Sequence, residues 1–239
     1  MTVTALVSGG KDSVFSAYLA ETQGWPVDEI VTLTPDDPES LLFHTPNLSI
    51  VALQAEAWGR PFRSVPVHGK GEAAETDALR LALSETRGPV VAGAIASSYQ
   101  WSRLQRVTFE LGRPAFTPLW GKDPARVVTA EIEAGLDIRF VHLAAEPLPM
   151  DWLGRRLDAD ALSDLVRFGD SVRPVHVAGE GGEFETLVVD APFFGRRIEL
   201  DDVRMSTDRD VGRLTVRKAH LEPKPWLHAP SHPSSPRKR

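Results

Sequence analysis

The chain contains no cysteine and no long hydrophobic run. Without a thiol, it has no cysteine nucleophile, persulfide carrier, cysteine-ligated zinc or cysteine-held iron-sulfur cluster. Its apolar runs extend over about five to eight residues, whereas a helix that crosses a membrane needs about 20. The first residues, Met1-Thr2-Val3-Thr4, lack the basic and apolar regions of a signal peptide. These absences predict a soluble, cytoplasmic protein with no membrane partner.

The composition is acidic, with a formal net charge of -6. A negative field does not favour long nucleic acids, so we do not expect a nucleic-acid partner. The chain has 239 residues, of which 42% are hydrophobic, and this is enough to bury a full core. The length fits one large or two small domains.

From Thr2 to about Val141, short aliphatic runs alternate with longer helical stretches, a pattern typical of βαβ units and a mostly parallel sheet. The predicted strands lie near residues 3–7, 28–34, 61–67, 89–93 and 137–143, and the predicted helices near 12–23, 48–58, 72–86, 98–111 and 123–134. We therefore predict an α/β fold with a Rossmann-like parallel sheet.

The pattern changes beyond Asp170. Strands are predicted near residues 175–178, 185–190, 197–200 and 213–219, joined by glycine and proline turns. The end of the chain is rich in proline and closes on Arg237-Lys238-Arg239. We predict an α/β domain over 1–95, a smaller α+β domain over 96–222, and a disordered basic tail over 223–239.

The loop Ser8-Gly9-Gly10-Lys11-Asp12-Ser13 follows the first predicted strand and opens the first helix. Glycines let the backbone approach a phosphate closely, and the free N-H groups of a helix N-terminus favour an anion. Lys11 adds a mobile positive charge that can stay close to the negative charge that develops on a leaving pyrophosphate. Ser8 and Ser13 offer hydroxyl groups, and Asp12 can hold Mg2+ through water. The alternative is a tight turn whose polar residues only cap a helix.

The loop resembles the S-G-G-x-D-S loop of the ATP pyrophosphatase (PP-loop) superfamily. That resemblance implies a HUP-type nucleotide-binding domain, bound ATP, and cleavage between the α and β phosphates to give AMP and pyrophosphate. The loop alone does not identify the substrate that reacts with ATP.

Three further stretches gather polar residues at predicted turns. Their candidate residues are Ser40 and His44 in 35–45; Gly93, Ser97, Tyr99, Gln100 and Arg103 in 93–103; and Glu180, Gly181, Gly182, Glu183, Glu185 and Thr186 in 179–186. Simpler roles exist for each: a loop histidine, an N-cap serine, packing aromatics and a solvated turn. Carboxylates crowded on a glycine-rich turn repel one another unless a cation relieves them, which favours a cation there.

Together these stretches resemble the diphthine-ammonia ligase, or diphthamide synthetase, family. The resemblance runs from Val3 to about Leu200 and also includes Pro118-Leu119-Trp120 and Leu153-Gly154-Arg155. It implies a cytosolic two-domain enzyme that adenylates the carboxylate of diphthine on elongation factor 2 and amidates it with ammonium. Residues 1–95 would bind ATP with Mg2+, and 96–222 would bind substrate and ammonium.

The resemblance suggests roles for the candidate residues. Lys11 and the loop are assigned to the β and γ phosphates, and the cluster of Glu180, Glu183 and Glu185 to ammonium or metal. His44, Tyr99, Gln100 and Arg103 are candidates for gripping the nucleotide or the acceptor.

Other functions remain open. The chain could be a ligase that adenylates a different small-molecule carboxylate, and Ser98 stands where the family commonly has an acidic residue. A tRNA-modifying enzyme is disfavoured by the acidic charge and the missing cysteines. An ATP-binding sensor without chemistry is the alternative from another class.

Overall fold

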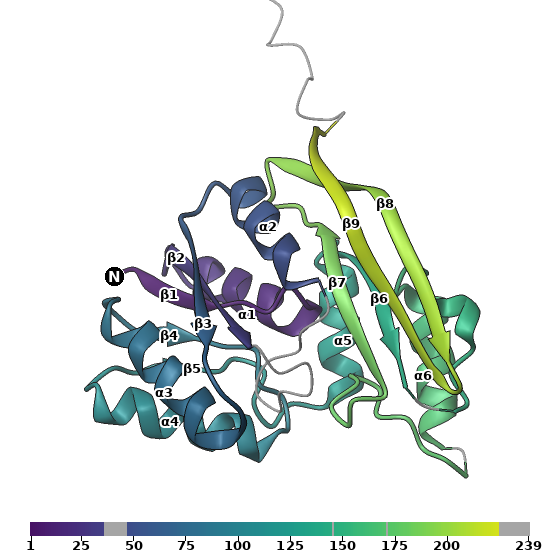
Figure 1. Cartoon of the computed structure of the whole chain (residues 1–239), viewed down its shortest axis with the longest axis horizontal. Helices are drawn as coiled ribbons and strands as arrows, with labels where there is room; N and C mark the ends of the chain where they lie inside the picture. The colour runs from purple at the N-terminus through teal and green to yellow at the C-terminus, as the bar shows by residue number, and fades with distance from the viewer. Residues whose placement is uncertain (36–46, 145, 171, 225–239) are drawn as a thin grey trace, which may run out of the picture.

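A computed structural model describes residues 1–35, 47–144, 146–170 and 172–224. Two sheets lie side by side with helices packed around them (Figure 1). The predicted fold class is confirmed: a parallel α/β sheet is followed by a smaller α+β part. Among the described residues, no helix is long and apolar enough to cross a membrane.

The first sheet has the strand order β3-β2-β1-β4-β5, and all of its pairings are parallel. Its strands are β1 (Val3–Leu6), β2 (Val27–Pro35), β3 (Phe62–Val67), β4 (Val90–Val91) and β5 (Ala115–Phe116). Its helices are α1 (Lys11–Thr22), α2 (Val51–Trp58), α3 (Gly71–Ser84) and α4 (Ser98–Glu110). Because the strands are parallel, their carboxyl ends meet at one edge of the sheet, where such folds bind ligands.

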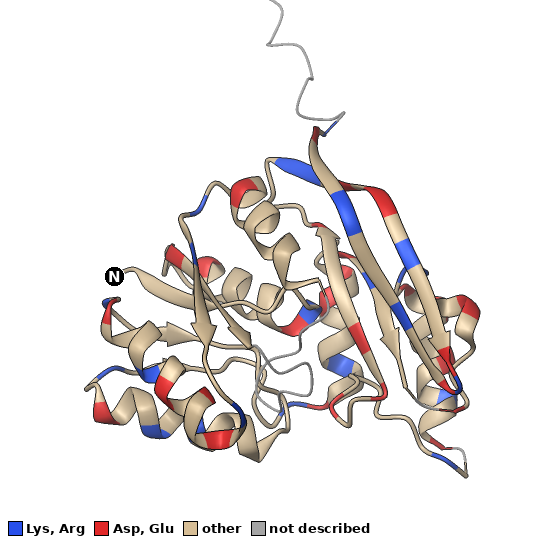
Figure 2. Ribbon diagram, in the orientation of Figure 1, with Lys and Arg blue, Asp and Glu red and all other residues tan. Residues whose placement is uncertain are grey.

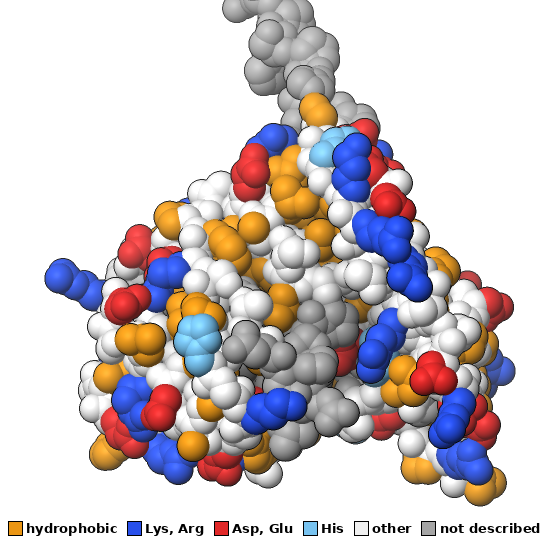
Figure 3. All heavy atoms as spheres, in the orientation of Figure 1, with side chains coloured by type: hydrophobic (Ala, Val, Ile, Leu, Met, Phe, Trp, Pro, Cys, Tyr) orange, Lys and Arg blue, Asp and Glu red, His pale blue; other side chains and the backbone are white. Residues whose placement is uncertain are grey.

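The second sheet is antiparallel, in the order β7-β6-β9-β8. It contains β6 (Asp137–Leu143), β7 (Phe184–Asp190), β8 (Arg196–Asp208) and β9 (Val211–Pro223), accompanied by α5 (Pro124–Glu133) and α6 (Ala159–Gly169). Short 3-10 turns, η1 (Leu48–Ile50) and η2 (Met150–Trp152), complete the elements. Lys and Arg side chains gather along β8 and β9 on the face shown in Figure 3, so the negative excess is not uniform.

The two parts share one hydrophobic core. Val3 and Val14 of the first part belong to the same cluster of buried side chains as Phe140 and Leu187 of the second. A smaller cluster, which includes Leu83 of α3, lies on the opposite face of the parallel sheet. The second sheet therefore packs against helices α1 and α2 of the first part, and a site between the two parts has walls from both.

Three details differ from the sequence-based expectations. The strand at 137–143 was expected to continue the parallel sheet, but β6 pairs antiparallel with β7 and β9, and β5 takes the fifth place in the first sheet. The prediction of a strand at 175–178 is wrong, because this segment is coil and turn. No helix was expected at α6, which begins after Asp158, whose carboxylate accepts a hydrogen bond from the N-H of Ala161.

The predicted domain boundaries stay a prediction. Two structural observations concern the residues at these boundaries. β5 pairs with β4, so the parallel sheet continues past residue 95. β9 extends to Pro223, and the side chain of Lys224 is buried. Both residues were assigned to the tail at 223–239, but they lie in the folded part. Residues 225–239 lie outside the described chain.

Candidate functional site

A cavity opens between the two sheets, at the carboxyl edge of the parallel one. Its walls come from the 8–13 loop, the ends of β1, β2 and β4, helices α3 and α4, and the 178–186 segment. The sequence-predicted residues that line it are Ser8, Gly10, Lys11, Asp12, Ser13, Gly93, Gln100, Glu180, Glu185 and Thr186. Residues predicted from three separate stretches are thus brought together.

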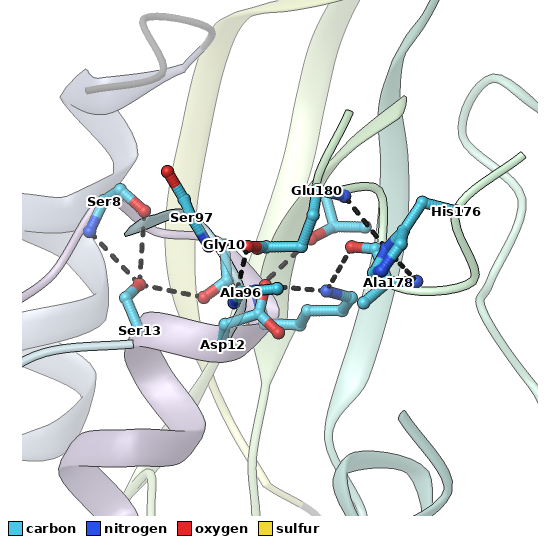
Figure 4. A network of polar contacts seen from close by, with 11 residues as sticks. Ser8, Gly10, Asp12, Ser13, Ala96, Ser97, His176, Ala178 and Glu180 are labelled. Atoms are coloured by element: carbon cyan, nitrogen blue, oxygen red, sulfur yellow. Dashed lines mark hydrogen bonds and ion pairs between the residues drawn. The ribbon is translucent and has the colours of Figure 1, made fainter. Parts of the chain in front are cut away.

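The loop between β1 and α1 is closed by its own hydroxyl groups (Figure 4). Ser13 Oγ accepts from the N-H of Ser8 at 3.2 Å and donates to the carbonyl of Gly10 at 3.0 Å. Gly9 has φ +90°, and an added Cβ would lie 3.2 Å from Val51. Glycine is therefore favoured here by its positive φ, and a side chain would also make a tight contact with Val51.

Lys11 is held in place from two sides. Its side chain is only 1% exposed, and Nζ donates to Asp12 Oδ2 at 2.6 Å and to the carbonyl of Ala178 at 2.9 Å. Burial alone would lower the pKa of Lys11, but attraction from Asp12, Glu131 and Glu180 outweighs it and raises the pKa above its ordinary value. Lys11 therefore keeps its positive charge at the cavity wall. It is the first residue of α1, and Figure 2 shows basic and acidic segments side by side at the start of this helix.

The start of α1 suits an anion. Helix α1 is 12 residues long and begins at Lys11, whose backbone N-H donates to Thr186 Oγ1 at 3.2 Å. An N-terminus of this length carries a partial positive charge, and here that charge faces a cavity that also contains an ammonium group. A phosphate chain fits this arrangement.

The described residues do not form a dedicated metal site. Among the described residues, no group of three or more His, Asp or Glu side chains could hold a metal ion. Asp12 Oδ2 is bonded to Lys11, and Glu180 Oε2 accepts from the N-H groups of Ala96 and Ser97, both at 3.0 Å. The Mg2+ role of Asp12 stays a prediction. Mg2+ commonly reaches such sites on the nucleotide's own phosphates.

The acidic turn separates into three different environments. Glu180 lines the cavity and joins the second part to the N-terminus of α4 through Ala96 and Ser97. Glu185 also lines the cavity, with Oε1 3.8 Å from His142 Nδ1 on the neighbouring strand. Glu183 does not line it.

Glu183 instead stabilises its own turn. Its Oε1 accepts from the N-H of His176 and its Oε2 from the N-H of Gly181, both at 2.9 Å. Gly182 has φ +81°, which allows the chain to reverse there. The catalytic role predicted for Glu183 is therefore not supported by its position, because both carboxylate oxygens already bind backbone groups.

The predicted site residues of the 93–103 segment also have different environments. Gly93 approaches the first turn of α1 so closely that an added Cβ would lie 2.5 Å from the nitrogen of Ser13. Ser97 caps α4 by accepting from the N-H of Gln100 at 3.4 Å, as its simpler interpretation requires. The guanidinium of Arg103 lies 3.0 Å from the ring centroid of Tyr99 and also pairs with Glu72 of α3.

Tyr99 and Arg103 are not among the residues that line the cavity, and they pack against each other. Ser97 does not line the cavity either, but its backbone N-H binds Glu180 in the wall. Gln100 does line the cavity. Ser40 and His44 lie outside the described residues, so their predicted roles stay predictions.

Several residues near the site were not found from the sequence. Thr32, Ala178 and His142 contribute through the fold, and nothing local in the sequence marks them. Glu131 of α5 is different, because it is fully buried and shares the buried face of its helix with Val127 and Val128. A carboxylate at an apolar position of an amphipathic helix is a signal that sequence reasoning could have used.

A Rossmann-like sheet of order 3-2-1-4-5 with Ser-Gly-Gly-Lys-Asp-Ser at its first strand-to-helix turn defines a nucleotide-binding protein of the PP-loop class. Residues 1–114 match the diphthamide synthase N-terminal domain family, and residues 123–221 match the diphthamide synthase C-terminal domain family. The chain belongs to the diphthamide synthase family.

Similar proteins carry matching names. The chain is 30% identical to a diphthine-ammonia ligase of Danio rerio, over 94% of this chain and 98% of that protein. It is 30% identical to the one of Homo sapiens, over 94% of each chain. It is 31% identical to the one of Schizosaccharomyces pombe over 84% of this chain, but it spans only 36% of that longer protein.

A solved structure titled as a predicted subunit of tRNA methyltransferase from Methanocaldococcus jannaschii is also similar. Its TM-score is 0.42 and its sequence identity 16%, over 80% of this chain and 98% of that chain. A likeness this weak supports no functional conclusion.

Proposed function

We propose that this protein is a diphthine-ammonia ligase, which uses ATP to convert the carboxylate of diphthine into an amide and releases AMP and pyrophosphate. One observation carries the proposal: a single cavity is lined both by the Ser8 to Ser13 loop and by the carboxylates Glu180 and Glu185. The first can hold a triphosphate and the second can attract a cationic nitrogen donor. An amide ligase needs both within reach of one acceptor.

The ATP part of the site combines charge with an apolar wall. Lys11 and the N-terminus of α1 would bind the phosphates and stabilise the charge that develops on pyrophosphate. Leu33, Leu79 and Leu104 line the cavity as well, and aliphatic side chains suit the flat adenine ring. Mg2+, carried by the phosphates, would supply further charge neutralisation.

The ammonium part is centred on Glu185. This side chain lies in the cavity wall, is 16% exposed, and has His142 as a neighbour at 3.8 Å. A carboxylate can hold ammonium by charge-assisted hydrogen bonds and accept a proton from it. His142 is the neighbouring base to which such a proton could pass. Glu180 adds negative charge on the same side.

The reaction balances in two steps. A carboxylate oxygen of the acceptor attacks the α-phosphorus of ATP, and pyrophosphate leaves to give an acyl adenylate. Ammonia then attacks the acyl carbon, AMP leaves, and the amide remains. The protein's part is to position the reactants and stabilise charge, which are the main contributions of enzymes to transfers at phosphorus.

The acceptor is proposed to be the diphthine of elongation factor 2, and the cytoplasm is the compartment where that factor works. The names of the relatives and both matched domain families support diphthine as the acceptor group. The site is consistent with it, because the cavity opens at the junction of the two sheets.

The test is to incubate the purified protein with ATP, Mg2+, ammonium and elongation factor 2 that carries diphthine. We expect AMP formation to depend on the acceptor and the acceptor to lose about 1 Da, as a carboxylate becomes an amide. AMP formed only with a small carboxylic acid would favour the alternative ligase. ATP that binds and stays intact with every acceptor would indicate a sensor.

A further inference from the structure

Three exposed arginines share one face of the antiparallel sheet. Arg213 and Arg217 lie on β9, and Arg204 lies on β8 opposite the residue midway between them. They project away from the core, because Leu214 and Val216, which alternate with them along β9, are buried in it. Diagonal neighbours on one face lie about 7 to 8 Å apart, so the three guanidinium groups can reach the same partner. We refer to Arg204, Arg213 and Arg217 as the arginine face.

The arginine face has no ion pair with a carboxylate among the described residues, although other arginines of the same hairpin do. Arg196 pairs with Glu56, and Arg197 pairs with Glu222. Asp208, at the turn end of β8, forms no ion pair with the arginine face in the described part of the chain. Three guanidinium groups are therefore exposed and available to a partner.

The fold itself does not need positive charge on this face. Charged side chains often protect the exposed edge strand of a sheet from pairing with another chain, and Arg204 on the edge strand β8 fits that role. Arg213 lies on β9 between β6 and β8, and the next residues of β9 bond their backbone groups to Asn47. Edge protection therefore does not explain Arg213 and Arg217. Like charges that are neighbours on a sheet cost stability, so a gathering of them in a chain of net charge -6 indicates a negatively charged partner.

The arginine face begins next to the cavity. Arg213 is the register partner of His142 on β6, and His142 is the register partner of Glu185 on β7. Paired residues project to the same side of a sheet, and the 3.8 Å between His142 Nδ1 and Glu185 Oε1 agrees with this. Glu185 lines the cavity. Because paired Cα atoms lie about 5 Å apart, the backbone of Arg213 stands about 10 Å from that of Glu185, on the same side of the sheet. Basic side chains continue from there along β8 and β9 (Figure 3).

We propose that the arginine face docks the protein that carries the acceptor, by binding carboxylates on the surface beside the modified side chain. The proposal rests on the function proposed above. A side chain that enters the cavity projects from a larger protein, whose surface then lies against the rim of the cavity. Specific protein contacts bury about 1,200 to 2,000 Å² in total, more than one side chain in a cavity provides. Arginine suits such a rim, because its planar fork binds a carboxylate through two hydrogen bonds.

The other polyanion that arginines bind is the phosphate backbone of a nucleic acid. Proteins that bind it make about 6 to 10 phosphate contacts along an extended track. The arginine face offers three cations, and Asp202 and Asp208 on β8 lie at its two ends, where they would repel a continuing backbone. A short group of carboxylates therefore fits this surface better than a nucleic acid does.

The experiment compares the double variant Arg213→Gln with Arg217→Gln and the matched control Arg196→Gln with Arg197→Gln, which removes the same charge from the same hairpin. Amide formation is measured with elongation factor 2 that carries diphthine and with the free amino acid diphthine, which has no protein surface around it. We expect the Arg213 and Arg217 variant to raise the KM for the protein acceptor by about tenfold, because charges at a rim act mainly on association. Its kcat, its KM for ATP and its turnover of free diphthine should match wild type.

The control variant should match wild type with both acceptors, since exposed ion pairs contribute little to stability. Charge reversal and salt give a second measurement. Arg213→Glu with Arg217→Glu should raise the KM for the protein acceptor by about 100-fold. Added NaCl should raise this KM in wild type and much less in the glutamine variant, because salt screens exposed charges. An unchanged KM for the protein acceptor, or an equal loss with free diphthine, would overturn the docking role.

Two further outcomes separate this proposal from its alternatives. If wild type binds a single-stranded RNA that the glutamine variant does not bind, while the KM for the protein acceptor is the same in both, the face belongs to a nucleic acid and the proposal is overturned. If wild type amidates neither acceptor, the proposed function fails by itself. Docking is then judged by calorimetric binding of elongation factor 2. Binding that is weaker in the glutamine variant than in wild type and the control supports docking, and equal or absent binding overturns it.

Discussion

Thr186 accepts a 3.2 Å hydrogen bond from the backbone N-H of Lys11, although the two residues lie 175 positions apart in the chain. A second contact lies beside it, because the N-H of Val188 donates to the carbonyl of Gly9 at 3.0 Å. Gln54 joins both partners, since its Nε2 donates to the carbonyls of Gly9 and Val188. Strand β7 therefore fixes the conformation of the Ser8 to Ser13 loop, to which we assign the phosphates.

This arrangement explains why the cavity needs both parts of the chain. The loop belongs to the parallel sheet, while Ala178, Glu180 and Thr186 come from the second part and contact the loop or line the cavity beside it. A binding group fixed before the ligand arrives loses less conformational freedom on binding. We therefore expect the contacts from β7 to contribute to the ATP affinity proposed for this loop.

Replacing Lys11 should affect both activity and stability. Lys11→Ala removes the charge proposed to stabilise pyrophosphate, and we expect turnover to fall by about 100-fold or more. Because Lys11 is buried, the change also leaves Asp12 without its cation, and the free energy of unfolding should fall by about 1 to 3 kcal/mol. AMP formation and urea unfolding measure the two effects.

The double variant Lys11→Ala with Asp12→Asn is the control for this pair. It should recover part of the stability, since the unpaired carboxylate is gone, and none of the turnover. Recovery of turnover would show that Lys11 has no role in phosphate chemistry.

Gly93→Ala should disturb the start of α1. Its new Cβ would lie 2.5 Å from the nitrogen of Ser13, which belongs to the backbone and cannot rotate away. We expect a loss of about 1 to 3 kcal/mol in stability, as for other overpacked positions, and weaker ATP binding measured by calorimetry. Gly195→Ala is the matched control, because its Cβ meets only the Ala57 carbonyl at an ordinary 3.5 Å. Equal effects at both positions would argue against a specific contact at Gly93.

Features set by local sequence could be predicted. Strands β1 to β4 of the parallel sheet follow aliphatic runs that the sequence shows, whereas β5 was not predicted. The loop after β1 has the glycines and hydroxyl groups that a phosphate turn requires. The Ser97 cap could also be read from one short stretch. In each case, the residues that decide the structure are neighbours in the chain.

Features set by distant contacts could not be predicted. β6 looks like a further parallel strand, and only its pairing with β7 and β9 places it in the antiparallel sheet. Glu183 and Glu185 differ by two positions, and the turn geometry alone decides that one binds backbone N-H groups while the other reaches the cavity. The charged groups that act on Glu131 are Lys11 and Asp12, which lie near the N-terminus and far from it in the sequence.

The two glutamates of the acidic turn should therefore respond differently to the same change. In Glu183→Gln, an NH2 group takes the place of one of the two oxygens that accept backbone hydrogen bonds. One of these hydrogen bonds is lost, and we expect the free energy of unfolding to fall by about 1 to 3 kcal/mol. Glu185→Gln removes charge from the cavity wall, and the KM for ammonium should rise by about tenfold while the Tm stays nearly unchanged. A raised KM for ammonium in Glu183→Gln alone would reverse this assignment.

Truncation tests where the fold ends. Removal of residues 225–239 should leave ATP turnover nearly unchanged, because proline-rich basic segments make few buried contacts. Removal from residue 224 should instead lower the Tm, because Lys224 is buried and its Nζ donates to the carbonyl of Ala191. Thermal unfolding and AMP formation of the two truncations measure this difference. Equal stability of both would show that Lys224 is dispensable.

Nitrogen should enter as free ammonium and not from glutamine. Most enzymes that take ammonia from glutamine use a cysteine thiolate to form a glutamyl thioester, and this chain has no cysteine. Glu185, with Glu180 nearby in the cavity wall, can hold the ammonium ion and accept a proton from it as the amine attacks.

Activity should therefore saturate with ammonium salts and rise with pH, as a larger share of the ammonium is present as ammonia. Purified protein supplied with glutamine in place of ammonium should form little AMP and no glutamate. Glutamate release and AMP formation are measured in the same reaction, with ammonium removed from the glutamine stock. If glutamate appears in step with AMP, the nitrogen comes from an amidase site, and Glu185 has another role.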